Sequence, residues 1–133
     1  VWSGEPSFHG EFFDFDGAIS RPLPVLASGV PFHVGGHSPA AARRAGRVGD
    51  GFQPLGLDPE LLSVRLATMR EAAIDAGRDP DAIELTLGAP LAGFDAETLD
   101  RLMAQGADRV LLSTASAVTS EIEDQVSAAA ELI

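Results

Sequence analysis

The sequence predicts an α/β protein in which four parallel βα units follow one another along the chain. Three observations predict this fold class: short apolar runs alternate with longer segments of helical periodicity, glycines lie at many of the junctions, and capping residues open the helical segments. Strands that alternate with helices form parallel sheets with right-handed crossovers. Four such units can form a small open sheet or half of an eight-stranded barrel, and the pattern leaves both open.

Composition limits what this chain of 133 residues can do. With 45% hydrophobic and 22% charged residues, it is typical of one globular domain with its own core. It contains no apolar run long enough to span a membrane and no signal-peptide pattern at its start. The lack of cysteine excludes disulfides, thiolate metal sites and cysteine nucleophiles, and it fits a cytoplasmic protein. The net charge of −11 argues against partners such as nucleic acid or an anionic membrane.

Residues 1–30 are predicted to form an arm that precedes the repeating units. The segment "FFDFDG" at 12–17 alternates phenylalanine with aspartate, and Asp16-Gly17 is a strong hairpin turn signal. The chain begins at Val1 without a methionine, so we expect it to be a piece of a longer protein.

The first βα unit is predicted over residues 31–48. The run "PFHV" favours a strand because it is rich in β-branched and aromatic residues. Ser38 is a good N-cap, and Pro39 suits the first helical position, where its missing N–H costs nothing. The segment "AAARRAGR" that follows is rich in strong helix formers, which predicts a helix over 38–48.

The turn between this strand and this helix is the candidate binding site. Gly35 and Gly36 can adopt positive φ and let another group approach the backbone closely. The N–H groups at the helix start point into the turn, where the helix dipole is positive. Gly35, Gly36, His37 and Ser38 are therefore predicted to bind an anion, typically a phosphate. Many strand–helix turns of this kind bind nothing, and the local pattern leaves that alternative open.

Three further units are predicted along the chain. Their strands lie near 51–55, near 83–88 and in the apolar run "DRVLLST" at 108–114. The helices start at three capping signals: Asp58 with Pro59, Asp95, and Ser120 with Glu123. Gly77 and Gly106 are predicted to end the first two of these helices. The apolar helix faces comprise Leu62, Leu66, Met69, Ala73 and Ala76, then Leu99, Leu102 and Met103, and finally Ile122, Val126, Ala129 and Ile133.

Three quoted segments carry a family resemblance when they are taken in order. "SFHGEFFDFDGAISRPLP", "GVPFHVGGHSPAAARRAGRVGDGF" and "RLATMREAAIDAGRDPDAIELTL" together resemble the C-terminal half of the bacterial luciferase-like oxidoreductases. The branch they resemble most uses the deazaflavin coenzyme F420. This resemblance implies that residues 31–133 form half of a (βα)8 TIM barrel, that residues 1–30 form a hairpin arm, and that the N-terminal half of the barrel is absent from this sequence.

The resemblance also implies a function. In this family the turn that matches Gly35, Gly36, His37 and Ser38 holds the cofactor phosphate through backbone N–H groups. The implied activity is hydride transfer between F420 and a small organic substrate, with an FMN-dependent monooxygenase as the alternative. The N-terminal half supplies most residues near the reacting carbon, so we assign no catalytic residue and expect the chain alone to be inactive. No metal site is assigned.

Several residues have two possible roles. His37 is expected to contact the phosphate or ribityl chain, or to face solvent. Gln53 and Pro54 are pocket candidates because they end a strand, where barrel active sites lie. His33 is expected to pack within its strand, while His9 lies in the arm and has either a surface role or a place in the substrate pocket.

Cutting a barrel in half creates two open strand edges and exposes its inner face. We therefore expect the chain to form a homodimer or to pair with the missing N-terminal half. A non-catalytic, self-associating half-barrel is the second candidate function. An independent phosphate-binding domain with an open sheet is the third.

Overall fold

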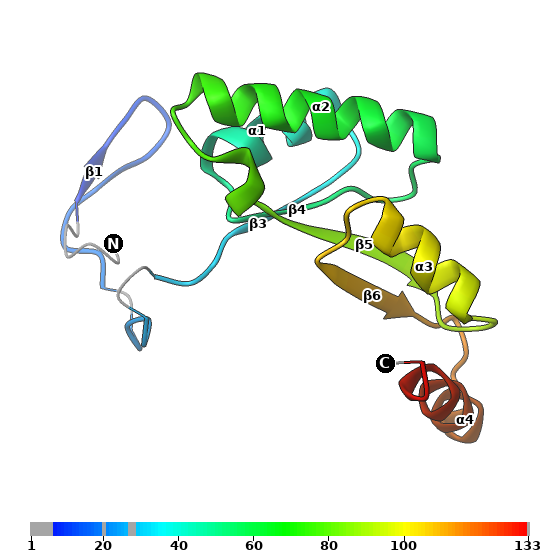
Figure 1. Cartoon of the computed structure of the whole chain (residues 1–133). Coiled ribbons are helices and arrows are strands. Elements are labelled where there is room, and N and C mark those ends of the chain that lie inside the picture. The colour runs from blue at the N-terminus through cyan, green and yellow to red at the C-terminus, as the bar shows by residue number, and fades with distance from the viewer. Residues whose placement is uncertain (1–6, 20, 27–28, 133) are drawn as a thin grey trace. The chain divides into compact units, whose positions relative to one another are not determined.

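The spatial order of the four parallel strands is the same as their order in the sequence. The computed structural model describes residues 7–19, 21–26 and 29–132, and it divides into two units, Val1–Pro31 and Phe32–Ile133. In the second unit the strand order is β3-β4-β5-β6, and every pair is parallel (Figure 1). Its elements are β3 (His33–Gly35), α1 (Pro39–Val48), β4 (Gly51–Gln53), α2 (Pro59–Asp75), the short 3-10 helix η1 (Pro80–Ala82), β5 (Glu84–Pro90), α3 (Ala96–Ala104), β6 (Arg109–Ser113) and α4 (Thr119–Ala130).

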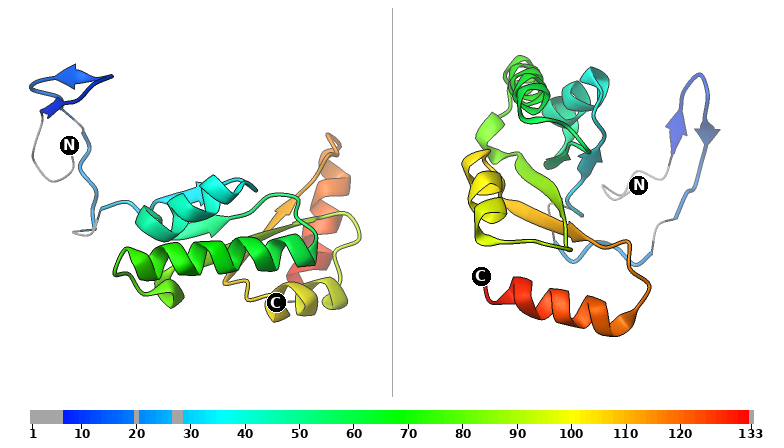
Figure 2. Two further views of the ribbon diagram at one scale, coloured as in Figure 1. Left: turned by 90° about the horizontal axis from the view of Figure 1, so that it is seen from above. Right: turned by 90° about the vertical axis from the view of Figure 1, so that its right-hand side faces the viewer.

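A sequential strand order with right-handed crossovers places successive helices on one face of the sheet. Figure 2 shows α1, α2 and α3 together on that face, with α4 beyond β6. A doubly wound open sheet has helices on both faces, whereas a barrel wall has them on the outside only. The predicted fold class, four parallel βα units arranged as half of a barrel, is confirmed.

The first three helices of this unit begin at the capping residues that the sequence indicates. The Ser38 hydroxyl accepts a hydrogen bond from the Ala41 N–H at 3.1 Å. The carboxylates of Asp58 and Asp95 accept bonds from the backbone three residues further on, each at 2.8 Å. These bonds satisfy N–H groups that have no partner inside the helix. Among the described residues, no helix combines the length and the apolar composition needed to cross a membrane.

The helices α1 and α2 pack directly against each other, and they approach most closely at Gly46. Ala42, Ala45 and Gly46 are buried on one side of α1, where only small side chains are found. A Cβ atom on Gly46 would lie 2.8 Å from the Ala73 nitrogen and closer still to the Met69 carbonyl oxygen. The backbones of the two helices can therefore meet only because position 46 has no side chain.

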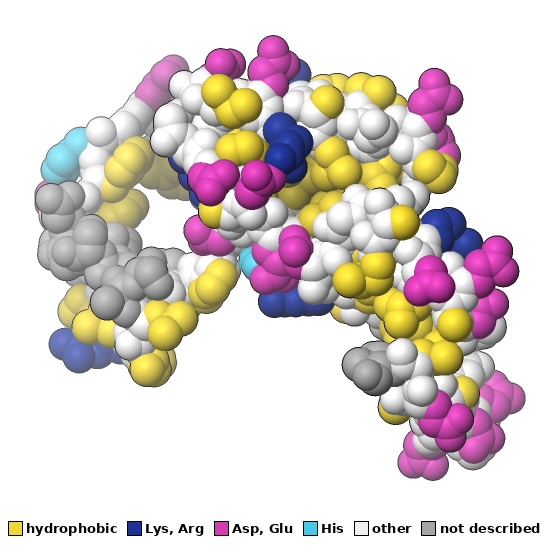
Figure 3. All heavy atoms as spheres, in the orientation of Figure 1, with side chains coloured by type: hydrophobic (Ala, Val, Ile, Leu, Met, Phe, Trp, Pro, Cys, Tyr) yellow, Lys and Arg dark blue, Asp and Glu magenta, His cyan; other side chains and the backbone are white. Residues whose placement is uncertain are grey.

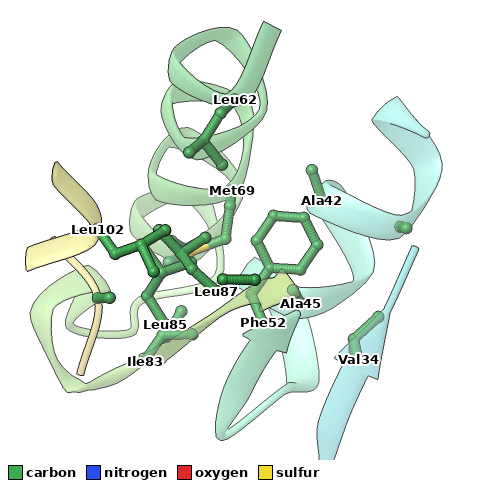
Figure 4. Close-up of a cluster of buried hydrophobic side chains, with 14 residues drawn as sticks. Val34, Ala42, Ala45, Phe52, Leu62, Met69, Ile83, Leu85, Leu87 and Leu102 are labelled. Carbon is green, nitrogen blue, oxygen red and sulfur yellow. The ribbon is translucent and has the colours of Figure 1, made fainter. Parts of the chain in front are cut away.

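The core lies between these helices and the sheet. Phe52 of β4 is fully buried, and its ring lies between α1 and α2 (Figure 4). Around it lie buried aliphatic side chains from both helices and from β5, and the cluster reaches α3 at Leu102. Alternate residues of each strand enter this cluster, so the remaining residues of each strand point to the opposite face. The buried members from strands are Val34, Phe52, Leu85, Leu87 and Ala89.

Arg78 ties the end of α1 to the end of α2. Gly77 has φ +68°, which ends α2 and turns the chain toward α1. The Arg78 guanidinium then donates hydrogen bonds to the carbonyl oxygens of Ala45 at 3.3 Å, Gly46 at 2.7 Å and Gly49 at 2.6 Å. These carbonyls belong to the last turn of α1 and the residue after it, where the helix dipole favours a cation.

In two pairs of adjacent strands, β3–β4 and β5–β6, an aspartate just before the second strand fixes where the pairing starts. The Asp50 carboxylate accepts the Phe32 N–H at 2.8 Å, and the Asp50 N–H donates to the Phe32 carbonyl at 2.8 Å. Before β6, Asp108 makes the same pair of bonds with Leu85, at 2.8 and 2.9 Å. Each aspartate thereby extends a parallel ladder by one residue.

In the first unit, the turn of the hairpin is formed by residues 10–13, which lie earlier in the chain than the turn that the sequence predicts. Strands β1 (Phe8–His9) and β2 (Asp14–Phe15) are antiparallel, and the Gly10 N–H donates to the Phe13 carbonyl at 2.9 Å. The prediction of a turn at Asp16-Gly17 is wrong, because that pair follows the second strand. The Phe8 and Phe15 rings lie directly opposite each other, with centroids 6.0 Å apart, and this contact favours the observed register.

Two other local predictions are wrong. Met103 is 55% exposed, because α3 turns only Leu102 fully into the core. The helix α4 starts after Val118, without a side-chain cap, so Ser120 and Glu123 do not form a capping box. Instead Ser116 lies before the helix, where its hydroxyl accepts the Val118 N–H and donates to Glu121. Ile133 lies outside the described residues.

The contact at Gly46 predicts that Gly46→Ala destabilises the fold. Alanine has a higher helix propensity by about 1 kcal/mol, so propensity alone would raise the free energy of unfolding. We expect a decrease of about 1–3 kcal/mol instead, because the added methyl group must separate α1 from α2. Urea unfolding measures this change. The matched control is Gly88→Ala, where the new Cβ atom would lie 3.8 Å from the nearest atom, and a stabilised Gly46→Ala variant would contradict the prediction.

The cap of α3 predicts a pH-dependent term in stability. Hydrogen bonds from the Thr98 hydroxyl and then from the Thr98 N–H hold the pKa of Asp95 below its usual value of 3.8. Since the folded-state pKa is the lower one, ionised Asp95 stabilises the fold above the unfolded pKa, and this is lost as the pH falls through the folded pKa. The advantage of the natural chain over Asp95→Asn should therefore shrink between about pH 6 and about pH 3. A constant difference in urea unfolding would contradict it.

Candidate functional site

The candidate site lies at the edge of the sheet where the strands end and the helices begin. The four residues 35–38 connect β3 to α1, and Gly35, His37 and Ser38 are exposed. Gly36 has φ +124°, and a Cβ atom placed on it would lie 3.2 Å from the Ala41 side chain. Glycine is needed here because an L-residue rarely adopts this φ and because the space is tight.

The N–H groups of this turn divide into two sets. The Gly36 N–H donates to the Gln53 carbonyl at 3.1 Å, which extends the β3–β4 ladder and removes that group from any ligand. Within residues 29–132, no hydrogen-bond partner is found for the N–H groups of His37, Ser38 and Ala40. A Cβ atom on Gly35 would meet nothing within 4 Å, so there is open space beside the turn. Three free donors at a helix N-terminus are suited to an anion.

Arg65 of α2 contacts the same turn. Its Nε atom donates a hydrogen bond to the His37 carbonyl oxygen at 2.8 Å. The interacting residues are 28 positions apart in sequence, and the acceptor is a backbone group. Sequence analysis did not find this residue, because no side-chain pattern marks a contact with a carbonyl oxygen.

A shallow hollow of about 400 Å³ lies beside the turn, at the ends of β4, β5 and β6. Gln53 is paired with Gly35 in the β3–β4 register, so the hollow begins one strand away from the turn. Two polar side chains line it, Gln53 and Ser113, together with the apolar Leu55 and Leu111. The strand spacing of about 4.8 Å places β5 about 10 Å from β3, so one extended molecule can contact both the turn and the hollow.

The face of the sheet opposite the helices, which corresponds to the interior of the barrel, carries several polar side chains. Glu84 and Arg109 form an ion pair on it at 2.9 Å. The His33 ring lies over Gly51, where a Cβ atom would approach it within 2.8 Å. Leu111, which is 48% exposed, is the large apolar side chain among the strand residues of this face.

The other residues singled out from the sequence lie at separate places. Pro54 lines a second cavity with Leu62 and Leu87 on the helix side, and this cavity adjoins the hollow that Gln53 lines. His9 belongs to the first unit, where its ring contacts Asp14 at 2.6 Å. Three arginines of α1 are exposed, and within residues 29–132 no hydrogen bond joins their side chains to the turn: Arg43, Arg44 and Arg47.

The strand order, the helices on one face and the ligand-sized openings at the strand ends define part of a (βα)8 barrel with a candidate site at the C-terminal edge. The model of the luciferase-like monooxygenase family matches residues 1–128. The chain therefore belongs to the luciferase-like monooxygenase family.

Individual relatives agree with this membership. An uncharacterized protein of Mycobacterium bovis is 35% identical over 106 residues, which cover 79% of this chain and 35% of the relative. An F420-dependent glucose-6-phosphate dehydrogenase of Mycolicibacterium gilvum is 36% identical over 87 residues, which cover 63% of this chain and 25% of that enzyme. The chain thus spans about a third or less of the length of these relatives.

The fold also resembles that of a solved enzyme. The structure of an F420-dependent secondary alcohol dehydrogenase in complex with an F420-acetone adduct matches with a TM-score of 0.81 and 18% identity. The match covers 98% of this chain and 56% of that chain. At this identity the likeness shows the fold, and it is consistent with a chain that forms about half of a barrel.

Proposed function

We propose that this chain is the C-terminal part of an F420-dependent oxidoreductase that transfers hydride between the deazaflavin and a small organic substrate in the cytoplasm. Two findings support the proposal: relatives of at least 35% identity include F420-dependent dehydrogenases, and the turn at Gly35–Ser38 has free N–H donors. The turn is the observation that carries it, because it gives this chain its own part in cofactor binding.

The residues of the turn fit a phosphate group. The space beside Gly35 is open, and the N–H groups of His37, Ser38 and Ala40 lie at the positive end of the α1 dipole. Ser38 is engaged through its hydroxyl in the cap, so its side chain serves the helix while its N–H faces the ligand. Gly36 contributes its shape rather than its N–H group.

The hollow at the strand ends takes the part of the ligand that follows the phosphate. Gln53 and Ser113 offer an amide and a hydroxyl for orientation, and Leu55 and Leu111 offer apolar contact. When bound, the deazaflavin supplies a carbon that accepts or donates the hydride. The residues of this chain bind and orient it, while the wall that faces its ring belongs to the other half of the barrel.

An FMN-dependent monooxygenase is the second candidate within the family. It also presents a phosphate to the turn, so the residues 35–38 serve both cofactors equally. A solved long-chain alkane monooxygenase matches with a TM-score of 0.53, compared with 0.81 for the F420-dependent alcohol dehydrogenase, and both likenesses concern the fold alone. Titration of the parent protein with F420 and with FMN distinguishes the two, since one cofactor should bind at least tenfold more tightly.

Gly36→Val should weaken cofactor binding in the parent protein by at least about tenfold. Valine cannot adopt φ +124° without strain, and its Cβ atom would press on Ala41, so the free N–H groups move away from the phosphate. Fluorescence titration gives the Kd for the phosphate-bearing cofactor. Gly77→Val is the matched control, because it introduces similar strain at φ +68° at the far end of α2. If the Gly36→Val variant binds the cofactor as tightly as the natural parent protein does, the turn is not part of the binding site.

The open edges of the sheet support pairing with another half-barrel. In the described part of the chain, β3 and β6 each pair with a strand on one side only, and Leu111 is exposed on the open face. We propose that the N-terminal half covers this face in the parent protein and that two copies pair when the chain is alone. The ion pair of Glu84 with Arg109 makes the face partly polar, so this pairing is weaker than that of a fully apolar surface.

The isolated chain should be inactive and should associate. Loss of half of the positioning groups costs orders of magnitude in rate, so we expect no measurable turnover of F420 with any substrate. Sedimentation at micromolar concentration should show a dimer. Turnover by the pure chain would contradict the proposed division of labour, and a monodisperse monomer would contradict the proposed pairing.

A further inference from the structure

Among the residues that the structure describes, Arg65 is the cationic side chain that hydrogen-bonds to the proposed phosphate turn. Its Nε atom donates to the His37 carbonyl oxygen at 2.8 Å, and no other protein partner is found for its guanidinium within residues 29–132. The residue is partly buried. Arginine stays ionised at any ordinary pH, so the positive charge is permanent.

The hydrogen bond of Arg65 determines the direction of a free N–H group. His37 and Ser38 are joined by one planar peptide group, in which the His37 carbonyl and the Ser38 N–H point in opposite directions. Because Arg65 holds the carbonyl toward α2, the Ser38 N–H must point away from α2. That N–H is among those without a partner within residues 29–132.

The backbone that carries Arg65 is itself held firmly against α1. One turn further along α2, Met69 and Ala73 lie against Gly46, at a separation that admits no side chain. The Arg65 guanidinium is therefore kept beside the turn by the packing of the two helices. A residue placed in this way can preorganise a site, because the geometry exists before a ligand binds.

We propose that Arg65 is a positioning residue for the phosphate of the ligand, acting through the His37–Ser38 peptide and through its permanent charge. This inference rests on the proposed function, because it assigns a residue to the same turn. Its effect is specific for the phosphate: the interaction is absent when the ligand lacks that group.

The test compares two ligands in the parent protein: the phosphate-bearing cofactor and the same ring system without its phosphate. Arg65→Met should raise the Kd of the first about tenfold and leave the Kd of the second unchanged. Arg65→Gln keeps a neutral donor for the His37 carbonyl and should recover part of the loss, as should Arg65→Lys, which keeps the charge. A general loss of structure would change both Kd values. The ratio of the Kd for the ligand without phosphate to the Kd for the phosphate-bearing cofactor therefore reports on the phosphate alone.

Arg70→Met is the matched control, since Arg70 lies on the same helix but pairs with Asp81. Its Kd ratio should equal that of the natural protein. If the natural protein prefers the phosphate-bearing ligand and Arg65→Met keeps that preference, the role of Arg65 is overturned while the turn stays in place. If the natural protein shows no such preference, the phosphate site itself is overturned, and the role of Arg65 with it.

Discussion

The approach of α1 to α2 at Gly46 is the contact on which the other arrangements depend. At this point α2 presents its backbone, and α1 presents a position without a side chain. Since both helices pack on Phe52, the same contact closes the core over β4 (Figure 4). It also fixes the position of α2 along the axis of α1. As a result, Arg65 lies at the turn before α1 and Arg78 lies at the end of α1.

The charges of the molecule are distributed in keeping with this arrangement. The chain has a net charge of −11, and acidic side chains are spread over the face shown in Figure 3. Such a surface repels anions in general. Attraction of the phosphate that we propose as ligand must therefore come from local groups, the N–H groups at the start of α1 and the guanidinium of Arg65, which act at short range.

Much of the fold could be predicted because its signals are local. Ser38, Asp58 and Asp95 mark helix starts through bonds to residues three positions ahead, and Gly77 ends α2 through its own φ. The hairpin turn was misplaced because the Phe8–Phe15 ring contact outweighs the turn preference of Asp16-Gly17. α4 starts without the capping box expected at Ser120, since Ser116 organises the residues before the helix instead.

The candidate site could be predicted only in part. The turn of residues 35–38 was found from its glycines and its cap, but the engagement of the Gly36 N–H with Gln53 depends on strand pairing. Arg65 and Arg78 were missed because both bind backbone carbonyls that any residue type would supply. Contacts of this kind leave no trace in residue type or spacing.

The two arginines have a consequence for how this surface can change in evolution. Both donate hydrogen bonds to main-chain carbonyl oxygens next to or within α1. Arg65 binds one oxygen before the helix, and Arg78 binds oxygens in its last turn and just after it. The identity of the outward-facing residues, Arg43, Arg44 and Arg47, does not enter these bonds. Substitutions on that side of the helix therefore leave these hydrogen bonds in place, so a lineage can acquire new surface charges there and keep the geometry of the turn.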